Sequence, residues 1–86
     1  MPFVYTFASE TEFTIYSEEG DIDATFVLKT RDGNTYQLVD ANDPYTTCTI
    51  VLDESGSIFL TVDNGGPWGS MSFYIDNADI TNPNGI

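Results

Sequence analysis

A chain of 86 residues with a formal net charge of −12 is long enough for one small domain and too acidic to bind nucleic acid or an anionic membrane directly. Hydrophobic residues make up 41% of the sequence and aromatic residues 14%, which excludes a disordered acidic tail. The sequence has no His and one Cys, so it offers no imidazole base and no intramolecular disulfide.

The apolar residues alternate along the chain with a period of two, and β-branched and aromatic residues dominate the apolar stretches. This alternation is typical of strands that bury one face. We therefore expect an all-β fold, a small single-domain antiparallel β-sandwich or barrel of about seven strands built from hairpins. The expected strands span residues 3–8, 12–17, 23–30, 34–40, 46–53, 57–63 and 70–76.

The first two strands are expected to pair around residues 9–11, and the next hairpin to turn around Asp32-Gly33. A two-residue turn there pairs Leu28 with Gln37. A three-residue loop with Gly33 in the left-handed region pairs Leu28 with Tyr36 instead. The three-residue loop sorts the apolar residues more cleanly onto one face, so we prefer it.

The hairpin around Glu54-Ser55-Gly56 has the clearest core pattern in the chain. Pairing Asp53 with Ser57 sets an apolar face across the two strands. It places Leu52 opposite Ile58, Ile50 opposite Leu60, and Cys48 opposite Val62. Because Cys48 lies on this apolar face, we expect it inside the core as a small hydrophobic residue. A reactive thiol has less support, because no neighbouring cation lowers its pKa.

The glycine-rich segment 63–69 is expected to be a loop, because Pro67 lacks a backbone donor. It holds Trp68, which either closes one end of the barrel or anchors a partner or a sugar. The expected domain covers residues 1–76, and residues 77–86 form an Asx-rich mobile tail.

Six of the 14 acidic residues fall between residues 10 and 23. On a strand, residues two apart point to the same side at a spacing of about 6.6–6.8 Å. Glu10 and Glu12 are two apart in the sequence, and so are the successive members of Glu19, Asp21 and Asp23. A row of carboxylates at that pitch resembles the regular negative charge of a nucleic-acid backbone. The same row also fits a solvated edge that keeps a β domain soluble and discourages edge-to-edge pairing. Both interpretations remain open at this point.

Catalysis and metal binding find weaker support in the sequence. Two carboxylates can hydrolyse glycosides across a cleft, but a β domain of this size has little room for one. We expect no enzymatic activity and no cofactor. The segments 18–23 and 40–43 carry oxygen ligands, yet neither matches the EF-hand pattern. We therefore predict no metal site and keep Ca²⁺ binding as an alternative.

In small size, all-β pattern and extreme acidity, the chain resembles small acidic inhibitors encoded by phages and mobile elements. These include DNA-mimic anti-restriction and anti-CRISPR proteins, and the immunity proteins of nuclease toxins are similar. The resemblance is compositional and rests on no motif. It implies a non-enzymatic cytoplasmic inhibitor that binds a basic nucleic-acid-handling protein by mimicking nucleic-acid charge. A cytoplasmic location also fits the single Cys and the lack of a basic signal-peptide region.

The residues expected to contact that partner combine the acidic segment with two aromatic anchors. They are Glu10, Glu12, Tyr16, Glu18, Glu19, Asp21, Asp23 and Trp68. The alternative function is a small β-sandwich module that binds carbohydrate or Ca²⁺, or a structural or virion protein.

Overall fold

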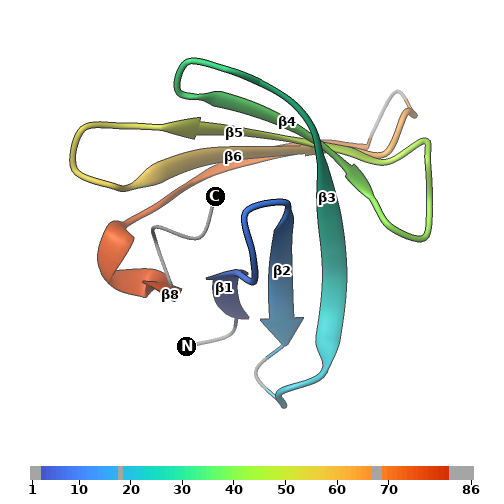
Figure 1. Ribbon diagram of the computed structural model, residues 1–86. Coiled ribbons are helices and arrows are strands. Elements are labelled where there is room, and N and C mark those ends of the chain that lie inside the picture. Colours follow the sequence, from blue (N-terminus) through green and yellow to red (C-terminus); the bar gives the residue numbers. More distant parts are fainter. Residues whose placement is uncertain (1–2, 18, 67–68, 82–86) are drawn as a thin grey trace.

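The computed structural model describes residues 3–17, 19–66 and 69–81, and folds them into one eight-stranded sheet (Figure 1). The strands are β1 (Phe3–Phe7), β2 (Glu12–Ser17), β3 (Ile22–Asp32), β4 (Thr35–Asp40), β5 (Thr47–Leu52), β6 (Ile58–Asp63), β7 (Ser70–Ile75) and β8 (Ile80–Thr81). Their order in the sheet is β7-β6-β5-β4-β3-β2-β1-β8. The sheet curls into a nearly closed barrel, and the long β3 joins the β1–β2 half to the β4–β7 half. The all-β prediction is confirmed, and each of the seven expected strands is present.

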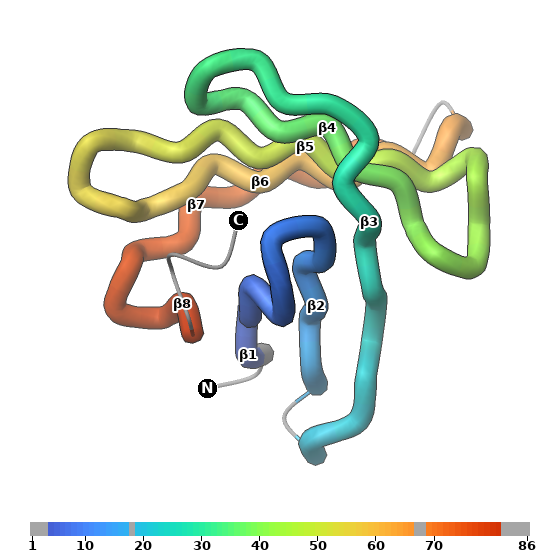
Figure 2. Tube along the Cα trace, viewed as in Figure 1, coloured from blue at the N-terminus to red at the C-terminus, as the bar shows by residue number. Residues whose placement is uncertain are grey.

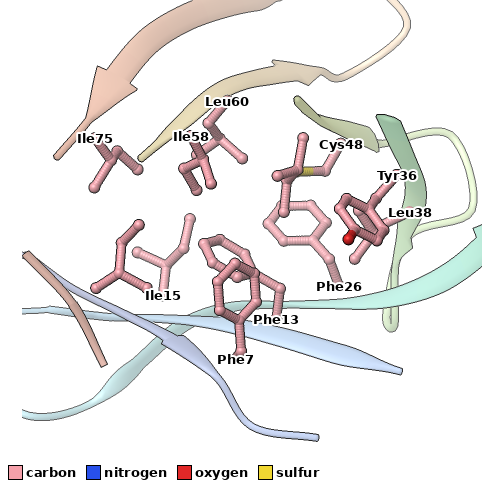
Figure 3. Close-up of a cluster of buried hydrophobic side chains, with 12 residues drawn as sticks. Phe7, Phe13, Ile15, Phe26, Tyr36, Leu38, Cys48, Ile58, Leu60 and Ile75 are labelled. Carbon is pink, nitrogen blue, oxygen red and sulfur yellow. The ribbon is translucent and has the colours of Figure 1, made fainter. Parts of the chain in front are cut away.

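The core fills the space between the two halves of the curled sheet. Phe7 and Phe13 pack with ring centroids 5.0 Å apart, and both are almost fully buried. Figure 3 shows side chains from the β1–β3 half pointing toward those of the β4–β7 half. The buried cluster is Phe7, Phe13, Ile15, Phe26, Tyr36, Leu38, Cys48, Ile50, Ile58, Leu60, Ile75 and Ile80.

The β5–β6 hairpin has the predicted register. Leu52 lies opposite Ile58, Ile50 opposite Leu60, and Cys48 opposite Val62. The Asp53 amide donates to the Ser57 carbonyl at 2.9 Å, which closes the expected three-residue loop. Gly56 has a φ of +86°, a left-handed conformation that favours glycine. Cys48 is fully buried, as predicted.

The β3–β4 hairpin has neither of the two registers that we considered. The turn consists of Gly33 and Asn34, so Asp32 pairs with Thr35. A bulge at Lys29 adds one residue to β3 and places Leu28 opposite Leu38. The prediction was wrong because a bulge changes the register within a strand, whereas we counted every pair from the turn. Because of this bulge, the turn lies at Gly33-Asn34, one residue later than the Asp32-Gly33 turn that we considered. Leu28 nevertheless packs against the core.

The folded domain extends beyond residue 76, where we expected the tail to begin. The 3₁₀ helix η1 (Asn77–Asp79) begins after Asp76, whose carboxylate accepts from the Ala78 amide at 3.0 Å. The chain then forms β8, which pairs in parallel with β1 (Figure 2). This strand buries Ile80. Residues 82–86 lie outside the described residues. The described part of the chain contains no helix that is long and apolar enough to cross a membrane.

Candidate functional site

The structure divides the predicted acidic residues into two groups at opposite ends of β2. Glu10 lies in the turn before β2, and Glu12 begins the strand. Glu19 and Asp21 lie in the turn after it, and Asp23 lies near the start of β3. The six residues of β2 separate the two groups by about 17 Å. These residues therefore form two acidic groups and not one continuous row. Glu18 lies outside the described residues.

The expected strand-like row of Glu19, Asp21 and Asp23 is also not present. Only Asp23 belongs to a strand, because the chain reverses direction at Gly20, which has a φ of +89°. The Ser17 amide donates to the Asp21 carbonyl at 2.8 Å, and the Gly20 amide to the Ser17 carbonyl at 3.0 Å. The acids of this turn therefore project from a tight reversal and do not share one strand face.

Several other carboxylates hold loops together. Asp53 accepts hydrogen bonds from the amides of Ser55 and Ser57 at 2.9 and 3.0 Å. Asp43 accepts from the Thr46 hydroxyl at 2.7 Å. The other aspartates that accept from a backbone amide two residues ahead are Asp40, Asp63 and Asp76. Asp40, Asp43 and Asp53 are thus already used by the fold.

The predicted interface acids have no such role within the described residues. Glu10, Glu12, Glu19 and Asp21 are exposed, and their side chains make no hydrogen bond or ion pair there. The two cations do not neutralise them. Arg31 lies over the Tyr36 ring at 4.8 Å and donates from Nε to the Gly33 carbonyl at 3.2 Å. As far as the described part of the chain shows, these four carboxylates are therefore free to meet a partner.

An apolar row crosses the outer surface beside the second acidic group. Tyr16 pairs with Val4 on one side and with Ile22 on the other. Val4 is 40% exposed and Ile22 is 64% exposed, while Tyr16 is half-buried. Tyr16 was predicted as an anchor, whereas Val4 and Ile22 were missed. Period-two alternation in the sequence would place Ile22 on the core face with Ala24 and Phe26. The register shift between β2 and β3 pairs Ile22 with Tyr16 instead, so Ile22 could not be found from the sequence pattern.

A hollow of about 280 Å³ opens between the two halves of the barrel. All of its lining residues are apolar except Asp23 and the amphipathic Tyr5. The lining residues are Tyr5, Ile15, Asp23, Ala24, Phe26, Val62, Met71 and Phe73. The Tyr5 and Phe73 rings lie 6.2 Å apart and are tilted by 51°. The walls of this hollow come from five strands that are far apart in the chain, so no local sequence pattern marks it.

A β-bulge brings Asp23 to this hollow. Ile15 pairs with Ala24 and Tyr16 with Ile22, which leaves Asp23 without a direct partner in β2. Such a bulge can redirect a side chain from one face of a sheet to the other. Burial, and then the nearby Asp23 carboxylate, raise the pKa of Tyr5 above its usual value. Asp23 therefore belongs to the hollow as well as to the acidic turn.

The alternative function, a module that binds carbohydrate or Ca²⁺, would require a metal site or an exposed aromatic anchor. Within the described residues, no group of three or more His, Cys, Asp or Glu could hold a metal ion. Trp68, the expected anchor for a sugar or a partner, lies outside those residues. Comparisons with protein-family models, with curated proteins and with solved structures found no match.

Proposed function

We propose that this chain is a non-enzymatic inhibitor that binds a basic nucleic-acid-handling protein and occupies its phosphate-binding channel. The observation that carries the proposal is the set of carboxylates that the fold does not use. Glu10, Glu12, Glu19 and Asp21 are exposed and unpaired within the described residues. Charges without a structural role are the ones that a partner can use without weakening the fold. Anti-restriction, anti-CRISPR and nuclease-immunity inhibitors all fit this description.

The charge density supports such a partner. A net charge of −12 over a longest dimension of 34 Å is about one charge for every 3 Å. Duplex DNA carries about one charge for every 1.7 Å of its axis. The protein therefore offers more than half of the linear charge density of DNA on a folded frame. Long-range attraction of this kind speeds association with a cationic channel and aligns the partners.

The β2–β3 end of the barrel is the better docking face. It combines Glu19 and Asp21 with the neighbouring apolar row of Val4, Tyr16 and Ile22. Interfaces are strongest where an apolar or aromatic anchor is surrounded by polar residues that exclude water. The end of the barrel with Glu10 and Glu12 also provides negative charge. However, the apolar row lies at the opposite end of β2 and does not extend to it.

Competition with DNA tests the proposal directly. The immobilised chain is incubated with a panel of purified nucleases and DNA-binding proteins at low ionic strength. Bound proteins are then eluted with duplex DNA or with a salt step. We expect both to release the bound proteins, because counterion-dependent contacts to the same channel weaken with salt. Binding that persists in salt and in excess DNA would contradict charge mimicry.

Two variants with equal charge change locate the face. Glu19→Lys/Asp21→Lys and Glu10→Lys/Glu12→Lys each replace two free carboxylates with cations. We expect the first variant to lose binding and the second to keep most of it. Equal losses would show that net charge alone drives binding, and the reverse order would place the interface at the β1–β2 turn.

A further inference from the structure

We propose that the hollow between the two halves of the barrel is a binding site for a small organic cation with an aromatic body, of the arylalkylammonium class. The proposal does not depend on the inhibitor function. It rests on the apolar lining of the hollow, on its size, and on Asp23, the one acidic residue of its lining, which lies at a β-bulge.

The size and lining of the hollow indicate the size and the aromatic character of the ligand. At about 280 Å³ it lies just below the range of roughly 300–1,000 Å³ that is common for small-molecule sites. A compact ligand with one ring is therefore the best fit. The rings of Tyr5 and Phe73, 6.2 Å apart and tilted, offer faces and edges to an aromatic guest. Ile15, Ala24 and Val62 add apolar contacts.

The charges at the hollow set the charge of the ligand. Asp23 is exposed and lines the hollow, and its carboxylate is close enough to raise the pKa of Tyr5. Neither Lys29 nor Arg31 contributes to the lining. An ammonium group would meet one carboxylate and two aromatic rings, which also attract cations. An anionic ligand of the same size would be repelled by Asp23 and by the net charge of −12.

Titration with three matched probes tests the site. The probes are 2-phenylethylamine, 2-phenylethanol and phenylacetate, which present a similar ring with a cationic, a neutral and an anionic end. Binding to the full chain is followed by NMR chemical shifts at neutral pH and low ionic strength. We expect saturable shifts at Tyr5, Phe73 and Met71. The amine should bind about two- to fivefold more tightly than the alcohol, as expected for a partly exposed charge pair. Phenylacetate should bind most weakly.

Two single-charge variants separate a local contact from the general field. Asp23→Asn removes the carboxylate at the hollow, and Asp21→Asn removes one that is exposed two residues earlier and does not line it. We expect Asp23→Asn to abolish the preference for the amine over the alcohol while the alcohol still binds. Asp21→Asn should keep most of that preference.

Three results would overturn the proposal. The first is the absence of saturable shifts at the lining residues with all three probes. The second is equal affinity for the amine and the alcohol in the unmodified chain. The third is an equal loss of preference in both variants, which would assign it to net charge and not to Asp23. Backbone shifts elsewhere in each variant report whether the fold is intact.

Discussion

Asp53 shows how one carboxylate can organise a hairpin. Its side chain accepts from two backbone amides and from the Ser55 hydroxyl, and its second oxygen accepts from the Tyr74 hydroxyl at 3.1 Å. The bond from the Ser55 side chain contributes most to holding the pKa of Asp53 below its usual value, and the Tyr74 hydroxyl adds to it. These bonds favour the ionised carboxylate, so they stabilise the loop more strongly when Asp53 is charged.

Asp53→Asn should remove a pH-dependent part of the stability. A carboxyl whose pKa is lower in the folded state stabilises the fold above its unfolded pKa, here 3.8. That contribution is lost as the pH falls through the folded pKa. We therefore expect the variant to be less stable than the parent at neutral pH, and the difference to shrink below pH 3.8. Urea unfolding at several pH values measures it.

Glu54→Gln is the matched control for this prediction. Glu54 carries the same charge as Asp53 and is the next residue in the same turn. Its side chain makes no hydrogen bond within the described residues. The control should leave the stability nearly unchanged at every pH. A difference for Asp53→Asn that stays constant with pH would contradict the role of ionisation.

The burial of Cys48 should make the free energy of unfolding depend on pH in alkaline solution. Burial raises the pKa of its thiol from 9.0 to about 12. Between these values the unfolded chain loses the thiol proton and the folded chain keeps it, so the free energy of unfolding falls as the pH rises. The fall should reach at most about 4 kcal/mol by pH 12. It should be smaller in Cys48→Ala, and unfolding curves of both proteins across this range measure it.

Thiol labelling checks the same burial independently. A fully buried and protonated thiol should react with a disulfide reagent only when the protein unfolds. Labelling should therefore accelerate in parallel with urea unfolding. Rapid labelling of the native protein at neutral pH would contradict the burial of Cys48.

At the scale of elements, the short β8 completes a sheet that would otherwise end at β1. It is two residues long and pairs in parallel with Tyr5 and Thr6. Two residues provide few backbone hydrogen bonds, so β8 depends on its side chains. Ile80 lies in the core at 7% exposure, which explains why the segment after residue 76 folds back onto the barrel.

Ile80→Ala should therefore lower the free energy of unfolding by about 2–4 kcal/mol, the cost of removing a buried aliphatic side chain. Ile22→Ala removes the same atoms from a side chain that is 64% exposed. It should change the stability by about 0.5 kcal/mol or less. Urea unfolding of the two variants measures the contrast, and similar effects would contradict the structural role of β8.

The strands and one register could be predicted because their signals are local. In β5 and β6 the apolar residues alternate without interruption, and Gly56 marks the turn, so each pair follows from one count. In β3 the bulge at Lys29 interrupts that count, and nothing in its own composition marks it. A two-residue parallel strand such as β8 also lacks a periodic pattern of its own.

For the candidate sites, the sequence predicted the type of residue but not how the residues are arranged in space. Acidity between residues 10 and 23 pointed to exposed carboxylates, four of which make no hydrogen bond or ion pair within the described residues. Their separation into two groups depends on the position of β2 between them, and the reversal at Gly20 takes Glu19 and Asp21 out of the strand. The position of Asp23 depends on a bulge. The hollow required contacts between β1–β3 and β6–β7, which only the curl of the sheet creates.

At the scale of the whole molecule, the net charge opposes folding. The sequence has two cations against 14 acids, and the barrel measures 34 × 31 × 21 Å. Many of the carboxylates are therefore closer together than in the unfolded chain, and their repulsion is reduced by dissolved salt. Carboxylates that accept hydrogen bonds gain stabilising contacts that offset part of this repulsion. Glu10, Glu12, Glu19 and Asp21 make no such contacts within the described residues.

Neutralising these four should make the protein more stable and less sensitive to salt. The variant Glu10→Gln/Glu12→Gln/Glu19→Gln/Asp21→Asn removes the repulsion without breaking a hydrogen bond of the described residues. We expect a gain of about 1 kcal/mol at low salt, or roughly 4–8 °C in Tm. The gain should shrink in NaCl, because salt already screens the parent. Thermal unfolding across a range of NaCl concentrations measures both effects.

A less stable variant would mean that these carboxylates stabilise the fold. A more stable variant that no longer binds its partner would show that they serve binding at the expense of stability.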